Sequence, residues 1–187
     1  MILECAQCKR LYDASGSEPG TPVACDCSDV LLVPDLDTME GDVLIENYMK
    51  RLAREEGFSP EQISRGEGWE LQRGSARIHV DYDKDDDLLT IESAILPMPH
   101  DNAMRARLFQ RVLELNHRST GEARFAILAT QVVVTFTRSA AGLDYAEFHR
   151  AIESVCRTAD DYDEELRSQF LSGVPVEDTD EVDLGKL

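Results

Sequence analysis

Four of the five cysteines lie within the first 27 residues, in two close pairs. Two residues separate Cys5 from Cys8, and one residue separates Cys25 from Cys27, sixteen residues further on. Structural zinc is held by four tetrahedral ligands, and two thiolate pairs on facing turns can supply them. A segment of about 30 residues cannot fold on hydrophobic burial alone, so we expect the metal to supply most of its folding free energy. The spacing predicts a structural Zn²⁺ site of Cys5, Cys8, Cys25 and Cys27.

Residues 1–33 resemble the short zinc-ribbon heads that precede many bacterial domains. Two features depart from that pattern, because the second pair is C-x-C and no glycine closely follows either pair. The alternatives are a redox dithiol at Cys5 and Cys8, or a segment without metal. A redox pair normally stands at the start of a helix beside a strand–helix–strand pattern, and this sequence has neither. Four cysteine ligands would leave no open position on zinc for catalysis.

A run of aspartates could also be a calcium loop. Counted from Asp81, acidic residues stand at positions 1, 3, 5, 7 and 12, as in a helix–loop–helix calcium site: Asp81, Asp83, Asp85, Asp87 and Glu92. Position 6 of such a loop requires glycine for its turn, but here it is Asp86. The flanking residues alternate like strands, so we expect a solvated hairpin turn.

The remaining candidates predict no catalytic site. Cys156 lies beside the apolar stripe of the last predicted helix, where we expect a small buried hydrophobic side chain. The four histidines share no metal spacing, and we expect them at the surface: His79, His100, His117 and His149. No GxSxG, P-loop, GxGxxG or HExxH motif is present. We therefore expect a protein that is not an enzyme.

The charge of the chain excludes several kinds of partner. It has 37 acidic and 19 basic residues, a net charge of −18, which repels phosphate backbones and anionic membranes. No apolar run approaches the roughly 20 residues of a membrane span, and the first ten residues lack the layout of a signal peptide. We expect a cytoplasmic protein that binds neither nucleic acid nor membrane.

Hydrophobic periodicity predicts the order helix, three strands, helix, two strands, helix. The helices are predicted near 38–56, 101–118 and 144–166, and residues 59–62 are predicted to form one more helical turn. The strands are predicted near 69–72, 77–82, 89–95, 125–128 and 132–137. Short connections at 74–75 and 84–87 indicate an antiparallel meander, and the fold class is α+β, an antiparallel sheet packed with helices.

The composition divides the chain into four parts. We expect a zinc-ribbon-like head at 1–33, a linker at 34–39, an α+β domain at 40–169 and an acidic flexible tail at 170–187.

Several segments of the second half resemble the YbjN-like and type III secretion chaperone-like superfamily. They are the helix end L-x-LN at 113–116, the strands RFAI and VVVTF, the GLD before the last helix, and Tyr162 near its end. The resemblance spans about residues 40–168. It implies a non-enzymatic domain, often an acidic homodimer, that binds other proteins.

We therefore expect a protein-binding module of the chaperone or adaptor type, acting as a homodimer. The apolar surfaces of the second helix or of the sheet would contact the protein partner or client. The alternative is a regulatory protein that recruits transcription or signalling machinery through its zinc head.

Overall fold

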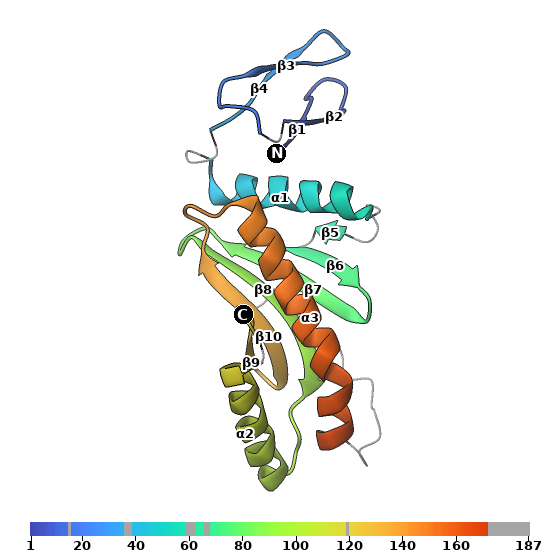
Figure 1. The fold of residues 1–187 in the computed structure, drawn as a ribbon, viewed down its shortest axis with the longest axis vertical. Coiled ribbons are helices and arrows are strands. Elements are labelled where there is room, and N and C mark those ends of the chain that lie inside the picture. Colours follow the sequence, from blue (N-terminus) through green and yellow to red (C-terminus); the bar gives the residue numbers. More distant parts are fainter. Residues whose placement is uncertain (15, 36–38, 59–62, 66–67, 119, 172–187) are drawn as a thin grey trace.

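A six-stranded antiparallel sheet forms the centre of the α+β domain (Figure 1). The computed structural model describes residues 1–14, 16–35, 39–58, 63–65, 68–118 and 120–171. The strand order is β5-β6-β7-β8-β10-β9, so β8 pairs with β10 across the connection that contains the second helix. The strands are β5 (Ile63–Arg65), β6 (Trp69–Arg73), β7 (Ala76–Asp83), β8 (Leu88–Pro97), β9 (Arg124–Leu128) and β10 (Gln131–Ser139).

Three helices complete this domain: α1 (Gly41–Glu56), α2 (Asn102–Arg118) and α3 (Tyr145–Phe170). The α+β class and the order of its helices and strands are confirmed. The edge strand β5 was not expected, and the helical turn predicted at 59–62 lies outside the described residues.

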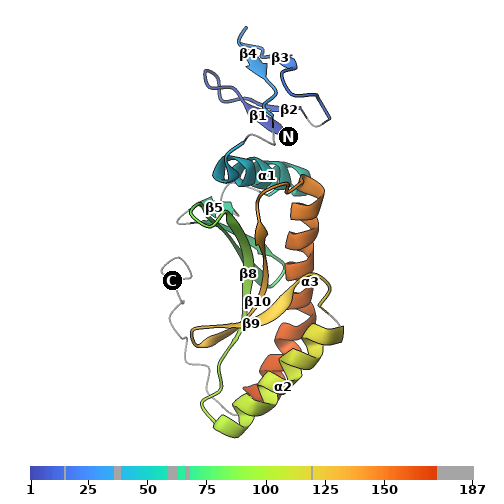
Figure 2. The ribbon, with the colours of Figure 1, turned by 90° about the vertical axis from the view of Figure 1, so that its left-hand side faces the viewer.

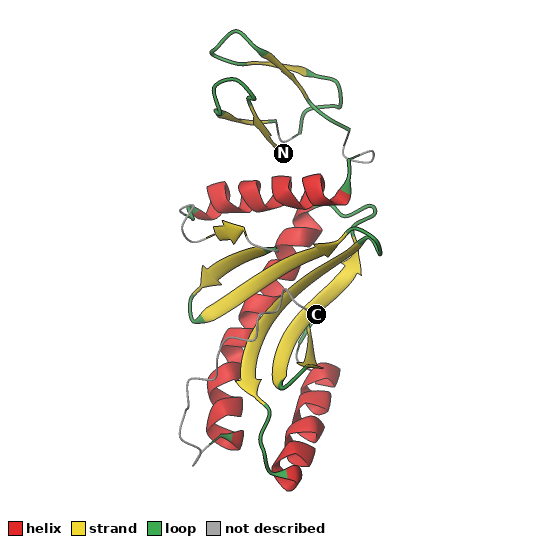
Figure 3. Ribbon diagram, turned by 180° about the vertical axis from the view of Figure 1, so that it is seen from behind, coloured by secondary structure: helices red, strands yellow, loops and turns green. Residues whose placement is uncertain are grey.

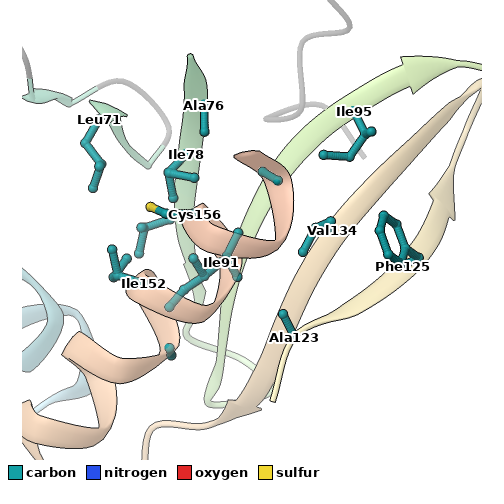
Figure 4. Packing of buried hydrophobic residues seen from close by; sticks show 14 of the residues in the cluster. Leu71, Ala76, Ile78, Ile91, Ile95, Ala123, Phe125, Val134, Ile152 and Cys156 are labelled. Atoms are coloured by element: carbon teal, nitrogen blue, oxygen red, sulfur yellow. The ribbon is translucent and has the colours of Figure 1, made fainter. Parts of the chain in front are cut away.

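Helix α3 covers one face of the sheet, as the edge-on view shows (Figure 2). Its Ile152 meets Ile78 of β7 and Ile91 of β8 in the main core, and none of the three is more than 1% exposed (Figure 4). Along most of β7 and β8, buried residues alternate with more exposed ones. Strands with a single buried face have this pattern. Among the described elements, no helix lies over the opposite face (Figure 3).

Side-chain caps fix the starts of α2 and α3, and a glycine follows the end of α1. The Asp144 carboxylate accepts a hydrogen bond from the Glu147 N–H (2.7 Å), and Asp101 accepts one from the Met104 N–H (2.8 Å). Helix α1 ends at Gly57, whose φ of 71° is the left-handed conformation common after helices. Its first residue, Gly41, follows Glu40, whose side chain makes no capping hydrogen bond.

The aspartate run forms the end of β7 and the turn into β8, so the hairpin prediction is confirmed. The Asp83 carboxylate accepts hydrogen bonds from the N–H groups of Asp85 (2.8 Å) and Asp86 (3.2 Å). Asp87 accepts one from the Tyr82 hydroxyl (2.8 Å) and one from the Ser139 hydroxyl (2.6 Å). These carboxylates therefore stabilise the turn and tie it to β10.

The head consists of two short hairpins at the end of the molecule beyond α1 (Figures 1 and 2). The first pairs β1 (Ile2–Glu4) with β2 (Leu11–Asp13), and the second pairs β3 (Pro22–Ala24) with β4 (Val30–Leu32). They share a small core of their own, made of Met1, Leu3, Ala14 and Val33. Helix α2 lies at the opposite end of the molecule. Within the described part of the chain, no helix is long and apolar enough to span a bilayer.

Candidate functional site

The structure brings the four predicted zinc ligands together at the junction of the two head hairpins. The sulfurs of Cys5 and Cys27 lie 3.6 Å apart, those of Cys8 and Cys25 3.4 Å, and those of Cys25 and Cys27 3.2 Å. All four sulfurs lie within 4.8 Å of one another, and all five cysteines of the chain are free. A Zn–S distance of about 2.3 Å places the sulfurs of a tetrahedral site about 3.8 Å apart. The cluster therefore has the dimensions of a four-thiolate site.

The first cysteine pair lies in a tight turn that two backbone hydrogen bonds close. The Cys5 carbonyl accepts a hydrogen bond from the Lys9 N–H, and the Cys5 N–H donates one to the Arg10 carbonyl. Each bond is 2.9 Å long. Lys9 has a φ of 60°, in the left-handed region where glycine is usual. A lysine thus adopts the backbone conformation that favours glycine, directly after the first cysteine pair.

The second pair repeats this arrangement with one residue fewer. The Cys25 carbonyl accepts a hydrogen bond from the Ser28 N–H, and the Cys25 N–H donates one to the Asp29 carbonyl. Both bonds are again 2.9 Å long. Ser28 has a φ of 70° and corresponds to Lys9 of the first turn. The shorter C-x-C spacing and the missing glycines are therefore both compatible with two facing cysteine turns.

A tyrosine of the first hairpin contacts the sulfur of Cys25. The Tyr12 hydroxyl lies 3.0 Å from this sulfur and accepts a hydrogen bond from the Asp26 N–H (3.0 Å), so its own hydrogen can point to the sulfur. This contact is the main cause that lowers the pKa of Cys25 to about 6. The Cys27 thiol donates to Cys25, which raises the pKa of Cys27 to about 12. One sulfur of the cluster is thus readily ionised near neutral pH.

The fifth cysteine is separate from this cluster. Cys156 is 4% exposed in the main core, close to Ile152 on the same helix (Figure 4). Burial raises the pKa of its thiol to about 11. The prediction of a small buried hydrophobic side chain is confirmed.

The sheet face away from α3 carries a row of polar residues that crosses five strands. In register, Glu70 stands opposite His79, His79 opposite Glu92, Glu92 opposite Thr135, and Thr135 opposite Arg124. Directly opposed residues of antiparallel strands share a face, so these five polar residues form one row on the side of the sheet away from α3. The imidazole of His79 is half-buried in the row, and its Nδ1 has no hydrogen-bond partner within the described chain.

Helix α2 is apolar on two sides. Its inner side packs into the main core through Leu108, Val112 and Leu115. Its outer side carries a second stripe at helical spacing: Ala106, Phe109 and Leu113. Ala106 is exposed, Phe109 is half-buried and Leu113 is 66% exposed.

The outer edge of the sheet beside α2 is partly closed by a side chain. The Asn116 amide accepts from the Phe125 N–H (2.7 Å) and donates to the Phe125 carbonyl (3.0 Å), so it replaces a neighbouring strand there. Backbone groups of an antiparallel strand alternate in direction, so those of Ile127 point the same way, outward. The Ile127 side chain is 49% exposed.

The chain therefore has an α+β domain with exposed apolar residues on the outer side of α2 and on the edge strand β9. The model of the TY-Chap1 family, described as "T3SS (YopN, CesT) and YbjN peptide-binding chaperone 1", matches residues 42–178. The match spans well over half of the chain, and the chain belongs to this family. It is a family of peptide-binding chaperones and not of enzymes, as the sequence predicted. The head precedes the matched range.

The fold is shared with chains of two solved complexes. The chain is similar to one in the ExsC–ExsE complex, with a TM-score of 0.51 and 13% identity over 68% of this chain and 97% of that chain. A chain of the HopA1–SchA chaperone–effector complex gives a TM-score of 0.51 and 9% identity over 68% and 98%. YbjN from E. coli gives 0.45 and 12% over 64% and 92%. No curated protein matches the chain in sequence.

Proposed function

We propose that this protein is a homodimeric cytoplasmic chaperone that binds an extended peptide segment of a client protein. The observation that carries the proposal is the apolar outer surface of α2 and β9, in a domain of a peptide-binding chaperone family. The similarity to a chain of a chaperone–effector complex supports a protein client. No catalytic role is proposed for any residue.

The outer stripe of α2 is suited to pairing with the same stripe of a second copy. Leu113 and Phe109 would leave water together, and each exposed apolar side chain that is fully buried contributes about 1.5–3 kcal/mol. A two-fold contact uses the same surface of both copies, so every contact between two different residues occurs twice.

The charges beside the stripe fit this symmetry. Arg107 and Glu114 are exposed and lie on the same flank, seven residues apart, equally far from the middle of the helix face. In an antiparallel pair centred between residues 110 and 111, Arg107 of one copy would stand opposite Glu114 of the other. Two ion pairs would then flank the apolar contact and set its direction.

Charge reversal tests the dimer. We expect the full chain to sediment as a dimer, R107E to sediment as a monomer, and the double variant R107E/E114R to recover the dimer, because the ion pairs return in reversed order. R150E, a charge reversal at an exposed position of α3, is the matched control and should remain a dimer. A monomeric wild-type chain, or a double variant no better than R107E, would contradict this contact.

The client segment is proposed to add a strand at the edge of β9. There the outward backbone groups of Ile127 can pair with an extended peptide, and its side chain offers an apolar contact. Binding to an array of 15-residue peptides from the host's secreted and regulatory proteins would identify such segments. We expect I127D to lose at least tenfold in affinity for the bound peptides, and T137D, at an exposed position of β10, to retain it. Equal affinities of the two variants would place the client elsewhere.

A second function is supported by the head. Val30 and Leu32 of β4 are 58% and 64% exposed and lie on the same side of their strand. They fit a regulatory protein that recruits transcription or signalling machinery through the head. In that case V30D/L32D would no longer bind the partner, and I127D would still bind it. If the protein is a chaperone, I127D would lose the client peptide and V30D/L32D would retain it.

A further inference from the structure

The head has too little apolar core to hold its own fold. Its buried cluster contains Met1, Leu3, Ala14 and Val33, with only a few half-buried neighbours. Domains below about 40 residues usually need a disulfide, a metal or a partner, and the cysteines here are free. A further link is therefore required.

The two hairpins of the head meet at the cysteines. They form two separate two-stranded sheets, β1-β2 and β3-β4, with no strand pairing between them. Cys5 follows β1 directly, and Cys25 follows β3 directly, so each turn lies at the end of one hairpin. The sulfurs of Cys5 and Cys27, and those of Cys8 and Cys25, approach each other across the two hairpins. A single ion at this point would join them.

The first hairpin also contacts the α+β domain, both beside the cysteine turn at Glu4 and at its open end at Asp13. Glu4, next to Cys5, lies 3.2 Å from the Lys50 ammonium group on α1. Arg54 of α1 lies 3.9 Å from Asp13 of β2, and Met39 packs against both the head core and the main core. The position of the first cysteine turn is therefore coupled to the contact between the head and α1.

We propose that one Zn²⁺, bound by the thiolates of Cys5, Cys8, Cys25 and Cys27, joins the two hairpins and thereby holds the head against α1. Four sulfur ligands in a tetrahedron are typical of zinc or of iron. Each thiol that becomes a ligand releases its proton as the Zn–S bond forms, and the ion remains divalent. The site binds zinc independently of the dimer contact and of the client edge, which lie at or near the other end of the molecule (Figure 1).

Metal analysis tests the ion. The full chain, purified without added metal and without a metal-affinity tag, should carry one zinc per chain, and C156S should carry the same amount. C8S should carry less than half. Because C8S could misfold, Co²⁺ replacement in the wild-type chain provides a second measurement, and should give the thiolate-to-metal absorption of tetrahedral sulfur ligation. Less than half an equivalent of zinc, stoichiometric iron, or a cobalt spectrum without thiolate bands would overturn the site.

Amide hydrogen exchange tests whether the ion holds the fold of the head. Removing zinc with a chelator should speed exchange at least tenfold at the head amides that donate backbone hydrogen bonds, those of Cys5, Ala14, Ser28 and Val33. Exchange at Val134, in the centre of the sheet, should not change. If the head amides exchange equally fast with and without zinc, the ion does not hold the head.

Discussion

The carboxylate of Glu4 lies 3.2 Å from the ammonium nitrogen of Lys50, so the head is tied to α1 one residue before its first cysteine. Both side chains are about one-third exposed, and exposed ion pairs typically contribute about 0.2–1 kcal/mol. In a double-mutant cycle of E4Q and K50A, measured by urea unfolding of the metal-loaded chain, we expect a coupling energy in that range.

The same cycle should give no coupling after zinc is removed, because the head then no longer holds Glu4 beside Lys50. The pair Arg111–Glu165 (2.6 Å), which links α2 to α3 away from the head, is the control, since its coupling does not depend on the head. A Glu4–Lys50 coupling that persists without metal would show that the head is held by other contacts.

Tyr12 should strengthen metal binding, although it is not a ligand. Its hydroxyl contacts the sulfur of Cys25, and groups that orient a ligand typically contribute about 10–100-fold to metal affinity. We expect Y12F to bind zinc at least tenfold more weakly in competition with a chromophoric chelator. Y162F, on α3, removes a tyrosine hydroxyl far from the cysteines and should bind zinc like the wild type. Unchanged affinity in Y12F would remove Tyr12 from the site.

Asn116 should protect the edge of the sheet. In N116A the N–H and carbonyl of Phe125 lose both side-chain partners, and a polar group left without a partner costs about 1–3 kcal/mol when buried. These groups are partly buried, so we expect a loss of about 1–2 kcal/mol in the free energy of unfolding, measured in urea. Q169A removes an exposed amide of α3 and should change it by less than about 0.5 kcal/mol.

Asp87 should make stability fall in acid. Its pKa is lowered first by the hydrogen bond from Ser139 and then by that from Tyr82. A carboxylate with a lowered pKa stabilises the fold above its unfolded value of about 3.9, and this stability is lost as the pH falls through the lower folded value.

The S139A variant removes the larger cause. NMR titration of the Asp87 carboxyl carbon should show a pKa closer to the ordinary value in S139A than in the wild type. S168A, near the end of α3, should leave the Asp87 titration unchanged. Identical titrations of Asp87 in S139A and wild type would contradict the assigned cause.

Most helices and strands could be predicted because their signals are local. The stripe Phe148, Ile152 and Val155 in α3 and the alternation Ile78, Val80 in β7 depend only on residues a few positions apart. Strand β5 could not be predicted in this way. It is only three residues long, and its place is set by pairing with β6. The pairing of β8 with β10, which are separated by α2, is likewise a long-range choice.

The sequence by itself determined which residues could bind a metal, where most helices and strands lie, and the family to which the chain belongs. Cysteine spacing and periodicity are properties of neighbouring residues, so they can be read without a fold. Only the tertiary structure decided that Lys9 and Ser28 adopt left-handed conformations that let a C-x-C turn face a C-x-x-C turn. It also placed Glu4 beside Lys50 and left the Phe109–Leu113 side of α2 outside the core. These outcomes depend on packing between segments that are distant in the sequence, which local patterns do not specify.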